Sequence, residues 1–75
     1  MPSIEEIIAA VRSHAVTHYI TGGWDVVAEC WDEHDIIEIT NFPDYPASIE
    51  EAVQRVAVVV ADIDEYRKEV QATAF

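Results

Sequence analysis

Two histidines are the first residues whose type and spacing could do chemistry. His14 and His18 stand four residues apart, which places them one turn apart on one face of a helix. Zinc sites use that spacing, and Cys30, His34 or Asp35 could complete a set of ligands. No HExxH or CxxC motif accompanies the pair, and the alternative is that both histidines border an apolar core. We therefore expect no metal site and no cofactor.

A cysteine nucleophile is the second candidate. Cys30 is the sole cysteine of the chain, and a nucleophile–base pair with His34 would have to meet across the end of a strand, which a four-residue separation rarely achieves. Its alternation with Val26 and Ala28 instead predicts a buried, inert thiol. A lone cysteine is typical of a reducing, cytosolic setting. We expect a cytoplasmic protein that is not an enzyme.

Paired carboxylates are the third candidate. If the middle of the chain is a hairpin, Glu29 and Glu38 lie directly opposite each other, and like charges in that position destabilise the hairpin. An outward face that combines these acids with Trp31 and Ile36 is typical of a binding surface. The alternatives are a register shifted by one residue, or neutralisation by basic side chains of the last third. A glycosidase-like pair is excluded, because so short a chain cannot build a substrate cleft around it.

The composition indicates which partners suit such a surface. The 75 residues include 15 acids and 4 bases, for a formal net charge of −11. Neither Lys nor Arg occurs between Arg12 and Arg55. Direct binding of nucleic acid is therefore disfavoured, because phosphates require Lys and Arg, and a basic protein surface is the natural complement. The longest apolar run is six residues, far short of the ~20 of a membrane span.

Two long helices must position these residues. The tetrapeptide Ser-Ile-Glu-Glu occurs at 3–6 and again at 48–51, and each copy is a capping box that predicts a helix N-terminus. Apolar residues at helical spacing extend the helices over about 4–20 and 49–72. A strand through 56–60 is the competing interpretation of the β-branched run there. The long helical pattern on both sides outweighs it.

Between these helices, alternation of apolar and polar residues predicts two strands, 24–32 and 36–40, joined by a turn. Their expected inner face consists of Val26, Ala28, Cys30, Ile37 and Ile39. The predicted fold class is α+β, an α-β-β-α two-layer unit in which two helices cover an antiparallel hairpin. Residues 1–75 form one domain. The second helix, ~35 Å long, exceeds what the hairpin can cover, so its far end, Phe75 included, needs another partner.

The outward face of the hairpin and its turn is the predicted partner-binding surface. It comprises Asp25, Glu29, Trp31, Asp32, Glu33, Asp35, Ile36 and Glu38. Its carboxylates would stand in for phosphates on a basic, nucleic-acid-binding target, with Trp31 and Ile36 as the apolar anchor. Reversing Glu29 and Glu38 to Lys should then abolish binding while the domain stays folded.

Two other functions are compatible with the sequence. An oligomerisation or assembly module would form a homodimer through the long second helix, with an interface of Val59, Ile63, Tyr66 and Val70. In that case the acidity would serve solubility alone. A metal-binding or small-molecule sequestering protein would instead depend on His14 and His18.

The segment Gly23–Trp31, the proline loop after it and Ser48–Val53 together resemble the small acidic open reading frames of phages and mobile elements. Some proteins of that type inhibit host defence systems such as CRISPR or restriction enzymes. The resemblance implies an inhibitor, and the acidity suits one of the DNA-mimic type.

Overall fold

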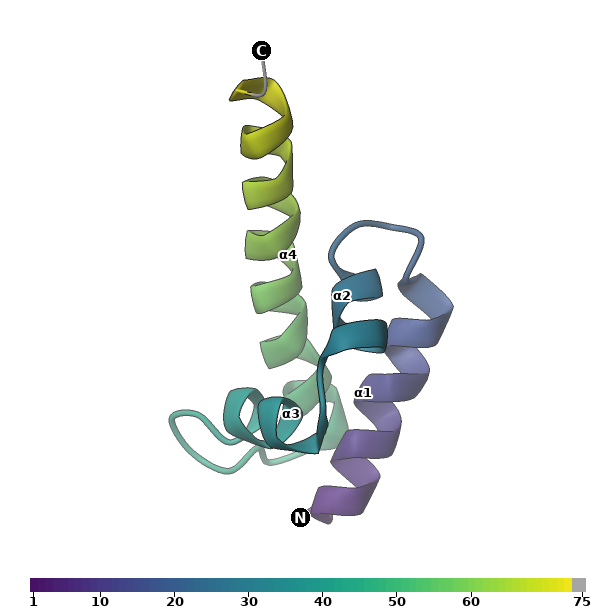
Figure 1. Ribbon diagram of the computed structural model, residues 1–75. Coiled ribbons are helices and arrows are strands. Elements are labelled where there is room, and N and C mark those ends of the chain that lie inside the picture. Colours follow the sequence, from purple (N-terminus) through teal and green to yellow (C-terminus); the bar gives the residue numbers. More distant parts are fainter. Residues whose placement is uncertain (74–75) are drawn as a thin grey trace.

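The computed structural model describes the backbone of residues 1–73 and the side chains of residues 1–72; the prediction for Phe75 lies outside them. This part of the chain consists of four helices: α1 (Ile4–His18), α2 (Trp24–Cys30), α3 (Glu33–Thr40) and α4 (Ile49–Thr73). α1 packs against the other three, and α3 also packs against α4. Figure 1 shows that the C-terminal turns of α4 extend well beyond the rest of the molecule.

The predicted hairpin is wrong, and with it the α+β fold class. The described residues contain no strand, and helices α2 and α3 occupy the two strand positions. The segment expected to be the turn is the N-terminus of α3. There the Asp32 carboxylate accepts from the Asp35 backbone N–H at 3.0 Å, and the Asp35 carboxylate accepts from the Asp32 N–H at 3.1 Å. This reciprocal capping box starts a helix where a turn was expected.

The expected inner face of the hairpin is wrong for the same reason. Helical periodicity buries Trp24 and Val27 of α2, and Ile36 and Thr40 of α3. Val26, Ala28, Ile37 and Ile39 are half-buried instead. Cys30, expected inside, is exposed.

The two outer helices confirm the capping prediction. The hydroxyl of Ser3 accepts from the backbone N–H of Glu6 at 3.2 Å, and that of Ser48 accepts from Glu51 at 3.1 Å. α1 and α4 begin at the following residues, Ile4 and Ile49. The competing strand at 56–60 is wrong, because that run lies inside α4.

One hydrophobic core joins the four helices. Its buried members are Ile7, Val11, Ala15, Trp24, Val27, Ile36, Ala52, Val56 and Val60. Within α1 and α4 these residues recur every fourth position, so each helix presents one stripe to the other. The hydroxyl of buried Thr40 is satisfied by donating to Ile36 O at 2.8 Å.

The two longer loops are fastened to α4. A Cβ on Gly23 would come within 2.9 Å of Val60 O and 3.0 Å of Ile63, so only glycine fits at this approach. Gly22 beside it has φ +108°, a conformation that favours glycine. From α4, the Arg55 guanidinium donates to Thr40 O at the end of α3, at 2.6 Å, and to Asp44 O in the α3–α4 loop. These contacts position α2 and α3 relative to α4.

None of the described helices is both long and apolar enough to cross a membrane.

Candidate functional site

Five of the six acids predicted to bind a partner lie between residues 29 and 38, on the end of α2, the link after it and α3. We call this group the acidic edge, and it consists of Glu29, Asp32, Glu33, Asp35 and Glu38. All but half-buried Asp35 are exposed. None of the five forms an ion pair with Lys or Arg within the described residues. Their one basic neighbour is His34, whose Nε2 lies 3.5 Å from a Glu38 carboxylate oxygen.

The capping box holds the carboxylates of Asp32 and Asp35 in position and favours the ionised form of Asp32. The backbone N–H of Asp35 donates to the Asp32 carboxylate and holds the pKa of Asp32 below its ordinary value. A hydrogen bond that stabilises the ionised form keeps the carboxylate charged to lower pH. The link between α2 and α3 contains only two residues, which restricts how far Glu29 can move from this pair.

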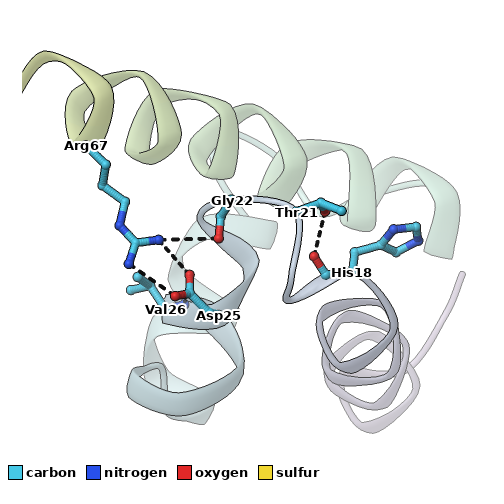
Figure 2. A network of polar contacts seen from close by, with 6 residues as sticks. All are labelled: His18, Thr21, Gly22, Asp25, Val26 and Arg67. Atoms are coloured by element: carbon cyan, nitrogen blue, oxygen red, sulfur yellow. Dashed lines mark hydrogen bonds and ion pairs between the residues drawn. The ribbon is translucent and has the colours of Figure 1, made fainter. Parts of the chain in front are cut away.

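Asp25, also predicted to bind a partner, is engaged elsewhere. Arg67 donates to both of its carboxylate oxygens, at 2.7 and 3.1 Å, and to Gly22 O at 3.3 Å (Figure 2). The hydrogen bond from Arg67 lowers the pKa of Asp25, and the same contact raises the pKa of Arg67. Figure 2 shows Arg67 reaching from α4 across to the start of α2. Asp25 is therefore a structural partner of α4.

Two further basic side chains, Arg55 and Lys68, also form ion pairs within the protein. Arg55 lies 3.7 Å from Glu51 in addition to its carbonyl contacts, and Lys68 lies 3.4 Å from Asp64. With Arg67, three of the four basic side chains thus contact carboxylates outside the acidic edge. Apart from the contribution of His34, the charge of the edge remains uncompensated.

The predicted apolar anchor does not exist as expected. Ile36 is fully buried in the core, and Trp31 is half-buried against it. Ile36 faces inward on the helical period of α3, and Trp31, the extended residue that follows α2, packs against the same core. The expected strand-like outward face is therefore not formed. A substitution of Ile36 would test stability rather than binding.

A groove that the sequence interpretation missed lies between α3 and α4. Ile39, Phe42, Val58 and Val59 supply its apolar walls, Glu38 and Arg55 also line it, and its volume is about 340 Å³. Phe42 is 75% exposed and Val58 56% exposed, although both are large apolar side chains. We call this feature the α3–α4 groove. Its signal was present in residues 56–60, whose four valines cover more than one face of a helix.

The residues of the predicted oligomer interface have separate environments. Val59 lines the α3–α4 groove. Ile63 is half-buried beside Gly23. Tyr66 is 67% exposed and Val70 46% exposed on the projecting part of α4.

The histidine pair forms an aromatic stack at the end of α1. The rings of His14 and His18 are 4.2 Å apart and stacked, and Trp24 lies 4.6 Å from His14. Burial, and then the charge of His18, lower the pKa of His14. In the part of the chain that the structure describes, no three His, Cys, Asp or Glu side chains gather in a way that could hold a metal ion. The arrangement matches two histidines that border the core.

Comparisons of the chain with protein-family models, with curated proteins and with solved structures each gave no match.

Proposed function

We propose that this chain is an acidic, non-catalytic binding protein whose acidic edge occupies a basic surface on a target protein. One observation carries the proposal. The edge carboxylates have no Lys or Arg partner in the described residues, whereas three of the four cations pair with carboxylates elsewhere. If the acids served only internal ion pairs, some of the cations would pair with the edge carboxylates. The pairs with Lys and Arg instead lie outside the edge.

The physical basis is electrostatic complementarity. A surface of one sign attracts a partner of the other sign over the screening length, which accelerates association and makes it sensitive to salt. Surfaces that bind phosphates are rich in Lys and Arg. A target surface that normally holds nucleic acid is therefore the most suitable complement, and the carboxylates would take the places of phosphates. Inhibition would follow from steric and electrostatic exclusion of the natural ligand.

The rigidity of the edge supports this role. The carboxylates of Asp32 and Asp35 are held by the capping box, and helices fix the backbones of the other three acids. Charges that are already in position lose little conformational entropy on binding. The edge is thus organised before the target arrives.

The test is a capture experiment with the purified chain as bait in a lysate of the source cell. Wild type is compared with two variants that each lose two negative charges. The edge variant carries Glu29→Gln and Glu33→Gln, neither of which lines the α3–α4 groove, and the control carries Glu5→Gln and Glu50→Gln. Glu5, Glu50 and Glu33 lie in the first turns of helices, whereas Glu29 lies in the last turn of α2. The control should therefore lose more stability than the edge variant, so a target that is lost only by the edge variant is not lost through unfolding.

We expect a basic, nucleic-acid-binding protein that elutes as salt rises, is retained by the control variant and is lost by the edge variant. Equal loss by both variants would mean that overall charge, and not the edge, holds the target. Capture that withstands high salt would contradict the electrostatic mechanism.

A further inference from the structure

The α3–α4 groove shares one residue with the acidic edge. Glu38 belongs to the edge and also lines the groove, and its side chain is 71% exposed. The apolar walls beside it include Phe42 and Val58, which are 75% and 56% exposed. A target that contacts the edge at Glu38 therefore meets exposed apolar surface next to it. Apolar surface that is rimmed by polar residues is typical of interaction sites.

A second carboxylate lies on the α4 side of the groove. Asp62 follows Val58 by four residues, so the two side chains point within roughly 40° of each other, and their positions are about 6 Å apart along the helix axis. Asp62 is exposed and forms no ion pair with Lys or Arg among the residues that the structure describes. Carboxylates from two helices thus border the groove, Glu38 on α3 and Asp62 on α4.

The basic residue that lines the groove, Arg55, is engaged within the protein. Its guanidinium donates to Thr40 O and Asp44 O and lies 3.7 Å from Glu51, and its side chain is only 19% exposed. An anionic ligand such as a fatty acid would therefore compete with these contacts for Arg55. A second copy of this chain is also disfavoured, because each copy has a net charge of −11. Charge complementarity favours a cationic occupant.

We propose that the groove takes a large apolar side chain of the basic target, and that Lys or Arg residues on either side of it contact Glu38 and Asp62. The inference rests on the proposed function and adds an apolar anchor that buried Ile36 cannot provide. The groove volume of about 340 Å³ lies at the low end of the ~300–1,000 Å³ of ligand pockets, which suits a side chain. A basic amphipathic helix laid between α3 and α4 would present this pattern.

The variant Val58→Asp separates this arrangement from attraction by charge alone. It removes an apolar wall and adds a negative charge, so electrostatic attraction alone predicts equal or tighter binding of a basic partner. Loss of the apolar contact predicts weaker binding. Val16→Asp is the matched control, because Val16 is 65% exposed on α1 and gains the same charge. Both sites are exposed, so both variants should keep wild-type helicity by circular dichroism.

The probes are synthetic helical peptides with Lys on both sides of a central residue, which is Phe in one peptide and Ala in the other. A third peptide keeps the Phe and has Glu in place of Lys. Titration calorimetry measures the affinity of each for the full chain. We expect wild type to prefer the Lys peptide with Phe at least about tenfold over each of the other two. Val58→Asp should abolish the preference for Phe over Ala, and Val16→Asp should keep it.

Equal affinity of wild type for the Phe and Ala peptides, or a preference that survives Val58→Asp, would overturn the proposal. So would a Glu peptide that binds as tightly as its Lys counterpart, or a dimer of the chain alone that Val58→Asp breaks, since a different occupant would then fill the groove. The proposed function fails separately. If the edge variant loses the captured target but wild type shows no preference for Phe, that function stands without the groove. The reverse result leaves the groove and removes the function of the edge.

Discussion

The two halves of α4 are made of one continuous helix but are held in different ways. From Ile49 to Val60, every fourth residue is buried against α1, with Ala52 and Val56 fully enclosed. From residue 61 to 72, only Ile63 and Asp64 are even half-buried. The second half is tied back through Arg67, which contacts Gly22 and Asp25, and the end of α4 extends past the other helices (Figure 1).

The difference shows where the stability of this chain lies. Burial of apolar surface stabilises the first half, because most helical stability in proteins comes from tertiary packing. The second half contributes little to the core and leaves Tyr66 exposed. A chain of this size has a thin core, so the buried residues of the first half carry much of its stability.

The largest expected effect contrasts two identical substitutions in the two halves. Val56→Ala removes two methyl groups from a fully buried site and should lower the free energy of unfolding by ~2 kcal/mol. Val70→Ala removes the same groups from a site that is 46% exposed, so its cost should be less than ~0.5 kcal/mol. Urea denaturation of both variants measures this. Equal costs would mean that the two halves are packed alike.

An intermediate effect is the pH dependence of stability that arises from His14, near the C-terminal end of α1. The pKa of His14 is lowered from an ordinary value of 6.5 by burial and by His18, so below that value the unfolded chain binds more protons than the folded one. Stability should therefore be complete above pH 6.5 and should fall as pH drops through 6.5 toward the lowered pKa. His14→Gln should flatten this dependence, whereas exposed His34→Gln should not. A urea midpoint that rises on acidification from pH 7 to pH 5.5 would contradict the assignment.

The smallest effect on global stability is expected from loss of the contact between Arg67 and Asp25. Arg67→Met removes the bidentate contact with Asp25 but keeps a helix-forming side chain. Amide exchange should accelerate in the last turns of α4, while amides near Val56 keep their protection. The Asp25 pKa is depressed by Arg67, so acidification through that lowered pKa should release the same turns in wild type. If amide exchange beyond residue 63 is the same in the variant as in wild type, the contact between Arg67 and Asp25 does not stabilise the end of α4.

The sequence predicts α1 and α4 because their start signals are local. Each Ser-x-x-Glu box caps the helix that follows it. The strand prediction for the middle of the chain was wrong because the apolar residues there fit both the helical period of 3.6 residues and the strand period of two. Trp24, Val27, Ala28 and Trp31 stand at i, i+3, i+4 and i+7, a helical stripe, while alternate residues of the same segment fit a strand. Recognising Asp32 and Asp35 as a capping box would have resolved the choice.

The candidate site was predictable in composition but not in arrangement. The acids of the edge can be read from the sequence. The engagement of Asp25 cannot, because Arg67 is 42 residues away and only the fold brings the two together. The α3–α4 groove depends in the same way on the crossing of two helices. Ile36 was predicted to point outward from a strand, but the segment is helical, and the helical period of α3 buries Ile36 in the core.

The central claim is that the acidic edge, whose carboxylates have no Lys or Arg partner in the described residues, holds a basic target. Its most direct test is to measure the bound target for wild type, the edge variant and the control variant at about 0.05 and 0.5 M salt. We expect added salt to release the target, the control to retain it and the edge variant to lose it. Binding by the edge variant that equals wild type, or binding that is unchanged at the higher salt, would contradict the claim.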